Sequence, residues 1–260
     1  MEYRVRIQFA SAIVVSALVV IALGIAASFV TSTYIAADAY QGRNEFDHRQ
    51  NQTITVKGST RRRVRSDRAV WTIVVKGEGE DLKSAFEVLD SGIGRVRDFL
   101  DKNGFSPNQV GLGAISTTTK YARNAKGNRT DEVTGYRLER RFGVTTADVN
   151  LVARAAGKVT QLLKEGVFVI SQAPEYTYTK LAPLKIDLMA AASSDARSRA
   201  EKIASSTECN LGELRDARMG VLQITAPDST EVSSYGMYDT YTIDKDVRAV
   251  VTATFGIEAS

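Results

Sequence analysis

Cysteine and histidine are nearly absent from this sequence, which holds one of each, Cys209 and His48, among 260 residues. One cysteine cannot form an intramolecular disulfide, and one cysteine with one histidine cannot build an ordinary zinc site. The single histidine also argues against a Ser-His-Asp site, and the motif G-x-S-x-G does not occur. We therefore expect neither a metal centre nor a hydrolase of this kind.

Motifs that bind nucleotides or nucleic acids are missing too. Gly77-Glu78-Gly79 lacks the third glycine of a dinucleotide fingerprint, and its acidic centre would repel a phosphate. The formal net charge is +4, from 34 Lys and Arg against 30 Asp and Glu, which is too small an imbalance to predict a nucleic-acid partner. The sequence predicts a protein that is not an enzyme and that uses no cofactor.

One long apolar run is present near the N-terminus. No charged residue occurs between Arg6 and Asp38, and the densest apolar part, Phe9 to Val30, is about 22 residues long. As a helix this part would measure roughly 33 Å, enough to cross a hydrocarbon core about 30 Å thick. We therefore predict one transmembrane helix, which binds membrane lipid.

The flanking charges predict the orientation of this helix. Arg4 and Arg6 precede it, whereas the residues that follow it carry mixed charge. By the positive-inside tendency, the short N-terminus is cytoplasmic and the rest of the chain lies outside. The stretch Ala37-Asp38-Ala39 also has the form of a signal-peptidase site, so a signal peptide cleaved after Ala39 is the alternative to a retained anchor.

The remainder of the chain predicts an α+β fold. A short first strand is expected at 53–57, and alternating apolar residues from Ala69 to Val75 indicate a half-buried second strand. Apolar residues at helical spacing predict three amphipathic helices, at 81–102, 148–164 and 184–207. The third has a face of alanines, so we expect it to pack closely on a sheet. Further strands are expected at 110–121, 135–146, 167–178, 220–225 and 247–257.

The predicted element order is ββαββ followed by αβαββ, a mainly antiparallel sheet packed with long amphipathic helices and preceded by one transmembrane helix. The inward face of the first helix is expected to include Leu82 and Phe86, and that of the second helix Leu163. The predicted parts are a cytoplasmic N-terminus at 1–8, an anchor at 9–32, a linker at 33–51 and an α+β domain at 52–258.

Short patterns along this domain resemble a known family. Ile54 to Gly58, Ser66 to Ala69 and the helix that ends at Gly104 resemble the opening of the SIMPL-domain family, of the YggE-like and periplasmic immunogenic protein type. The likeness continues to residue 258, although Ser66 stands where the family pattern usually has proline. The later matching segments are 135–137, 195–204, 211–214 and 247–255.

The resemblance implies an exported bacterial α+β domain, often assembled into rings or cages, with no established catalytic activity. With the orientation above, it places the anchor in the bacterial inner membrane and the domain in the periplasm. The cleaved alternative is a free periplasmic protein.

Four arginines, Arg61, Arg62, Arg63 and Arg65, form the clearest charge cluster, which the sequence places between the first two strands. Three interpretations stay open: a solvated turn, a contact with an acidic surface of a neighbouring subunit, or a contact with anionic lipid headgroups. Because no aromatic platform accompanies the arginines, we do not expect nucleic acid to bind there.

Three tyrosines, Tyr235, Tyr238 and Tyr241, recur every three residues in a long polar stretch. Exposed tyrosines bury large areas at low entropic cost and so suit a protein interface, although a loop folded onto its own domain fits as well. Together with the arginines they are the candidate contacts with an oligomer or another partner.

These features predict a membrane-anchored, non-catalytic extracytoplasmic protein that self-assembles into a ring- or cage-like homo-oligomer with a structural role at the cell envelope. The alternative is a ligand- or client-binding module linked to a stress response. The sequence does not identify a protein client.

Overall fold

The computed structural model describes residues 52–259 of the chain. The predicted cytoplasmic N-terminus, anchor and linker lie outside the described residues, as do Arg4 and Arg6. Between residues 52 and 259, no helix is both long and apolar enough to cross a membrane. The described chain divides into a larger compact unit, residues 57–196 and 218–252, and a smaller one, residues 52–56, 197–217 and 253–259.

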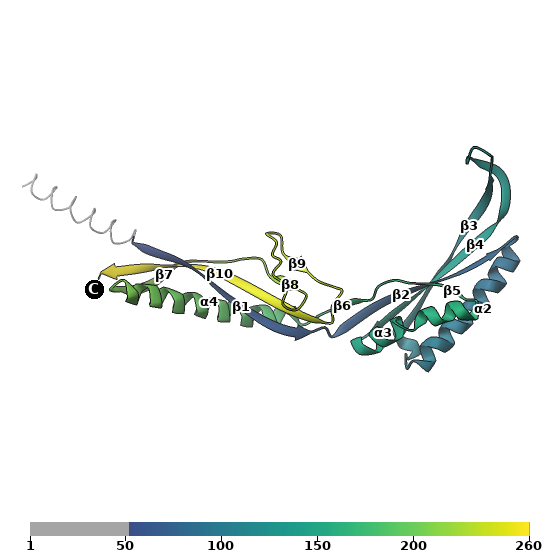
Figure 1. Cartoon of the computed structure of the whole chain (residues 1–260). Coiled ribbons are helices and arrows are strands. Elements are labelled where there is room, and N and C mark those ends of the chain that lie inside the picture. Colours follow the sequence, from purple (N-terminus) through teal and green to yellow (C-terminus); the bar gives the residue numbers. More distant parts are fainter. Residues whose placement is uncertain (1–51, 260) are drawn as a thin grey trace, which may run out of the picture. The chain divides into compact units, whose positions relative to one another are not determined.

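The predicted α+β class with mainly antiparallel sheet is confirmed (Figure 1). The first sheet has the order β1-β10-β8-β9, with β7 also paired to β10. Its strands are β1 (Thr53–Arg65), β7 (Cys209–Met219), β8 (Gln223–Thr225), β9 (Met237–Tyr238) and β10 (Asp244–Ala259).

The second sheet has the order β3-β4-β2-β5, with β6 also paired to β2. Its strands are β2 (Arg68–Gly79), β3 (Val110–Arg123), β4 (Arg129–Thr146), β5 (Phe168–Ser171) and β6 (Glu175–Thr177). The helices are α2 (Leu82–Lys102), α3 (Val149–Ala156) and α4 (Leu181–Ser206), with short 3₁₀ turns η1 (Pro107–Gln109) and η2 (Val159–Glu165).

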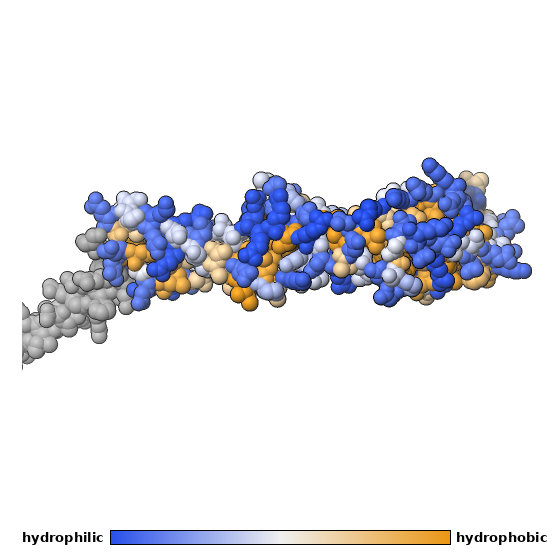
Figure 2. Space-filling model, turned by 90° about the horizontal axis from the view of Figure 1, so that it is seen from below, coloured by the Kyte–Doolittle hydropathy of each residue, from blue (hydrophilic) through white to orange (hydrophobic). Residues whose placement is uncertain are grey.

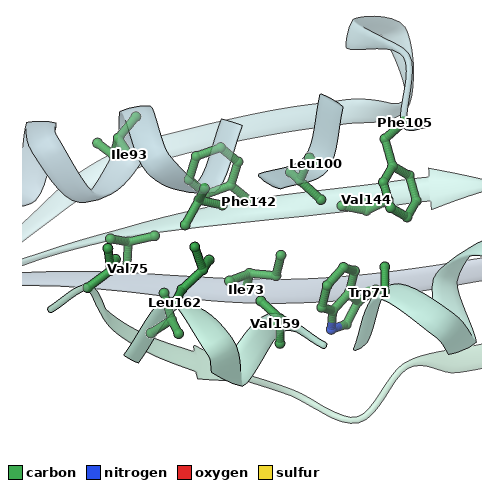
Figure 3. Packing of buried hydrophobic residues seen from close by; sticks show 14 of the residues in the cluster. Trp71, Ile73, Val75, Ile93, Leu100, Phe105, Phe142, Val144, Val159 and Leu162 are labelled. Atoms are coloured by element: carbon green, nitrogen blue, oxygen red, sulfur yellow. The ribbon is translucent and has the colours of Figure 1, made fainter. Parts of the chain in front are cut away.

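The alternation in β2 builds the main core of the larger unit. Trp71, Ile73 and Val75 point to one face of the second sheet and are fully buried. Residues of α2 and η2, among them Ile93 and Val159, pack against them (Figure 3). Asp81 is the N-cap of α2, and its carboxylate accepts a hydrogen bond from the Ser84 amide at 2.8 Å. The predicted first helix and second strand are therefore confirmed.

Two residues expected on the inward face of α2 are exposed, Leu82 and Phe86, so that part of the prediction is wrong. The first turns of α2 lie against β2 at Gly77, where a Cβ would come within 2.4 Å of the Ala85 carbonyl oxygen. On its other edge, β2 pairs with β5 from Ile73 to Lys76, and this pairing ends before Gly77. The sheet beside Gly77 is therefore too narrow to cover the flank of α2.

The predicted helix at 148–164 is interrupted. The helix α3 ends at Ala156, with Gly157 as its C-cap, and the chain continues as the 3₁₀ turn η2. A 3₁₀ turn repeats every three residues instead of 3.6, so Val159 and Leu162 become the buried pair and Leu163, which was expected inward, is exposed.

The strand prediction was incomplete in the first sheet. The strand β1 continues through Arg65, so the four arginines lie within a strand instead of between two strands. Strands β7 and β9 of this sheet were not predicted. In the second sheet, the predicted strand at 167–178 is divided into β5 and β6. The predicted order αβαββ of the second half is therefore wrong. Most side chains of β7 are exposed, which removes the apolar alternation that marks a strand.

The alanine face of α4 is buried as expected: Ala192, Ala196, Ala200 and Ala204. In the larger unit this face reaches the backbone of β1, because a Cβ on Gly58 would lie 2.1 Å from the Ala192 carbonyl oxygen. In the smaller unit, the Ile257 amide donates to the Gln52 carbonyl at 3.0 Å, and the hydroxyls of Thr55 and Thr254 are 2.9 Å apart.

We predict that Gly58→Ala lowers the free energy of unfolding by about 3 kcal/mol, because the added methyl group meets backbone atoms that cannot move without shifting α4. Gly94→Ala is the matched control. A Cβ at Gly94 meets nothing within 4 Å, and a helical glycine replaced by alanine gains roughly 0.5–1 kcal/mol. Urea unfolding of both variants measures the difference, and equal stability of the two would show that α4 does not lie this close to β1.

Candidate interaction surface

The arginine cluster on β1 faces acidic residues of the same chain. The carboxylate of Asp246, on β10, accepts hydrogen bonds from Arg63 Nε at 2.9 Å and Nη2 at 3.2 Å. Arg63 Nη2 also lies 2.9 Å from Oδ1 of Asp228, whose own amide donates to Asp246 at 2.9 Å. The Asp246 carboxylate is only 4% exposed, and these donors compensate its burial.

The other arginines are paired as well. Arg61 lies 3.4 Å from Asp246, and Arg65 lies 3.1 Å from Asp244 and 2.7 Å from the Asn150 side-chain oxygen. Arg62 points to the other face of β1, where it lies 3.0 Å from Asp187 of α4. Each arginine side chain stays about half exposed.

Hydrogen bonding to Arg63 is the main cause of the unusual acidity of Asp246. It lowers the pKa of Asp246 to about 2 from an ordinary value of 3.8, against an opposing effect of burial. The same contacts raise the pKa of Arg63. The pair is therefore ionised throughout the physiological range and ties β1 to β10.

The tyrosine loop, residues 226–242, is connected to this ion-pair network through Asp228. A short parallel pairing of β8 with β9 fixes its middle, with Gln223 opposite Met237. The Asp239 amide also donates to the Ile224 carbonyl at 2.9 Å. Between Asp228 and β9, the loop is held by the side-chain amide of Gln223, which donates to the Ser233 carbonyl at 2.6 Å.

A buried lysine fixes the end of the tyrosine loop. Lys245 is fully buried, and its Nζ donates to the Thr242 carbonyl at 2.6 Å and to Asp239 Oδ2 at 3.3 Å. Burial lowers the pKa of Lys245, an effect that Asp239 opposes. Burial would raise the pKa of Asp239, but hydrogen bonds from Thr242, the Tyr241 amide and Lys245 hold it below its ordinary value. The two charges compensate each other, with the Lys245 side chain fully buried and that of Asp239 14% exposed.

The tyrosines themselves point outward from this fixed base. Tyr235 is 94% exposed, Tyr241 76% and Tyr238 47%. The nearby Val232 is also exposed. Of the two interpretations of these tyrosines, the structure places Tyr235 and Tyr241 away from their own domain; whether a partner contacts them remains a prediction.

A separate groove of about 670 Å³ lies between α2, the free end of β2 and the start of β5. Its walls include the apolar Val88 and Phe168. Two of its charged groups are paired within the chain: Lys76 lies 2.7 Å from Glu139, and Glu78 accepts from Lys120 and Arg137. Among residues 52–259, no group of three His, Cys, Asp or Glu side chains is placed to hold a metal ion.

The structure thus brings Arg61 and Arg63 to Asp228 at the base of the tyrosine loop. It places Arg65 beside Asp244 of β10 and Arg62 beside Asp187 of α4. Sequence reasoning missed Asp228, Asp239, Lys245 and Asp246. The alternation of arginines at positions 61, 63 and 65 with aspartates at 244 and 246 was the signal available, since paired strands bring such side chains together.

We predict that Arg63→Gln weakens the acid dependence of folding. Because the folded pKa of Asp246 lies below its unfolded value, its stabilisation is present above about pH 4 and is lost as the pH falls through about 2. The variant should be less stable at neutral pH and lose less stability on acidification. Arg62→Gln is the control, and urea unfolding across this pH range is the measurement. Identical profiles for both variants would contradict the role given to Arg63.

We also predict that Asp239→Ala costs about 3 kcal/mol or more in free energy of unfolding, because it leaves Lys245 buried without its partner. The double variant Asp239→Ala with Lys245→Met should be more stable than Asp239→Ala alone, since the uncompensated charge is gone. Hydrogen exchange of residues 235–243 localises the effect. A single variant as stable as the unaltered protein would show that the pair does not hold the loop.

The family SIMPL, described as "Protein of unknown function (DUF541)", matches residues 54–255, which is most of the chain. No curated protein matches it. The resemblance seen in the short patterns of β1, α2 and α4 is thereby confirmed, and the chain belongs to the SIMPL family.

Proposed function

We propose that this protein is a membrane-anchored, non-catalytic extracytoplasmic SIMPL protein that self-assembles into a ring- or cage-like oligomer with a structural role at the cell envelope. Membership of the SIMPL family supports the coarser part, an extracytoplasmic protein without catalysis. The anchor is supported by the length of the apolar run from Phe9 to Val30.

The tyrosine loop is the observation that carries self-assembly. Association normally costs entropy when interface side chains and loops become ordered. Here the loop is already fixed by Lys245, Asp239 and the pairing of β8 with β9, while Tyr235 and Tyr241 stay exposed. A tyrosine contributes a large contact area with few rotatable bonds, so a fixed loop with exposed tyrosines favours binding another protein surface.

A second exposed apolar surface supports the same proposal. Figure 2 shows hydrophobic side chains interrupting a mostly hydrophilic surface. The exposed apolar residues of α4 in the larger unit are Ile186 and Met189, one helical turn apart. Exposing these two side chains beside each other does not stabilise a monomer, whereas contact with a neighbouring copy could bury their apolar surface.

The anchor would strengthen weak contacts between copies. Domains tethered to one membrane are confined to a layer, which raises their effective concentration without adding a contact. Interfaces built from a few tyrosines and a short helical patch would then be sufficient for a ring, even though each is small.

The groove beside α2 favours a second candidate function, binding of an extended client segment. Its apolar walls, Val88 and Phe168, lie beside the end of β2. Within residues 52–259, no strand pairs with Glu78 on the β5 side. An added strand could pair there through main-chain hydrogen bonds. This function would leave the oligomeric state unchanged when the tyrosines are altered.

We predict that replacing both Tyr235 and Tyr241 by alanine shifts the detergent-extracted full-length protein from oligomer to smaller species, with at least a tenfold weaker association, which corresponds to about 1.4 kcal/mol. The control variant carries Leu82→Ala and Phe86→Ala, which remove exposed apolar area from α2. Light scattering with detergent correction gives the mass. An unaltered protein that is monomeric at micromolar concentration would refute self-assembly, and equal effects of both variants would refute the role of the loop.

A further inference from the structure

The β3–β4 hairpin ends in a basic tip, defined here as residues 120–130. It carries Lys120, Arg123, Lys126 and Arg129, and no acidic residue occurs within it. None of these residues belongs to the arginine cluster on β1. Asp131 and Glu132 follow on β4, behind the tip.

Within the described residues, three of the four cations of the tip have no ionic partner. Lys120 lies 2.8 Å from Glu78. In the part of the chain described, residues 52–259, no ion pair involves Arg123, Lys126 or Arg129. Arg123 instead donates to the Gly127 carbonyl at 2.8 Å, and the Arg129 guanidinium lies 3.6 Å from the centre of the Tyr121 ring. These three positive charges are therefore available to an external anion.

The tip projects beyond the rest of its sheet (Figure 1). The last residue pair between β2 and β4 joins Gly79 to Tyr136, so residues 129–135 of β4 pair with β3 alone. Residues of such a two-stranded ribbon can reach a flat surface without a clash from the domain behind them.

The shape of the tip is set by its own hydrogen bonds. The side-chain oxygen of Asn124 accepts from the amides of Lys126 and Asn128, both at 3.0 Å. Gly127 has a φ of +82°, a left-handed conformation that a side chain would disfavour. The cations are thus presented on a defined turn, so binding needs little further ordering.

Apolar groups accompany the cations. Tyr121 and Val133 are paired across the two strands, and Val133 is exposed. Segments that combine Lys or Arg with aromatic and aliphatic side chains bind at the headgroup level of a bilayer: the cations contact anionic lipids and the apolar groups reach the acyl boundary.

We infer that the hairpin tip binds anionic phospholipid headgroups at a bilayer surface. Nucleic acid fits less well because the one aromatic ring at the tip is covered by Arg129 instead of being free to stack on a base. The transmembrane helix predicted from the apolar run Phe9 to Val30 also indicates that this protein is located at a bilayer. The inference does not depend on self-assembly, since a single copy carries the complete tip.

The test uses the full chain in nanodiscs of phosphatidylcholine, so that the N-terminal segment is already occupied by lipid. Separate vesicles are then added, made of phosphatidylcholine with or without phosphatidylglycerol, and co-flotation of the protein is measured. We expect binding only to the vesicles that contain phosphatidylglycerol, and we expect it to weaken as salt is raised.

The decisive variant reverses three charges: Arg123→Glu, Lys126→Glu and Arg129→Glu. Since each cation near an anionic surface contributes roughly a fivefold gain in binding, the loss should be roughly 100-fold or more. The matched control, Arg97→Glu with Lys158→Glu and Lys185→Glu, changes the net charge equally at exposed positions elsewhere. Arg123→Lys with Arg129→Lys should retain binding, because charge and not guanidinium geometry is required.

Several results would overturn the inference. One is no flotation of the unaltered protein with vesicles that contain phosphatidylglycerol. Another is an equal loss in the two charge-reversal variants, which would assign the effect to net charge. A third is tighter binding of a single-stranded oligonucleotide that displaces the vesicles, which would assign the tip to nucleic acid. Circular dichroism melting of each variant verifies that the fold is retained.

Discussion

The buried carboxylate of Asp246 is the interaction on which the proposed surface depends. It lies where β1, β10 and the tyrosine loop meet, and it is compensated by Arg63 from one strand and by the Asp228 amide from the loop. A carboxylate left buried without such donors would cost several kcal/mol. This one charge therefore links the loop to β1 and β10, which are already paired in the sheet. Lys245 and Asp239 repeat the same arrangement at the other end of the loop.

These two buried charges explain how an exposed loop can be a specific surface. A long loop with a single conformation needs many internal contacts, and here they are ionic and main-chain contacts made below the tyrosines. The side chains that would meet a partner are left out of that network. Stability and recognition therefore depend on different residues, which is why charge variants and tyrosine variants should differ in their effects. The basic tip of the β3–β4 hairpin separates the two in the same way: Asn124 shapes the turn, and three of its four cations form no ion pair within residues 52–259.

The sequence predicted those parts of the fold whose periodicity reflects one buried face. Alternation in β2, the spacing in α2 and the alanines of α4 are examples, and all three elements are present. It failed where burial is not periodic: β7 exposes most of its side chains, and η2 changes the repeat after Gly157. The arginines and tyrosines were recognised as notable, but their acidic partners and Lys245 were not. Pairing between residues 63 and 246 depends on strand register, which no local pattern contains.

Self-assembly through a surface that includes the tyrosine loop would be visible in the shape of the native particle. Images of the full-length protein, extracted in mild detergent and viewed as single particles, test it most directly. We expect closed, symmetric particles in which the tyrosine loop of one copy, residues 226–242, contacts the next copy. Isolated single copies, or closed particles in which every tyrosine loop faces solvent, would contradict it.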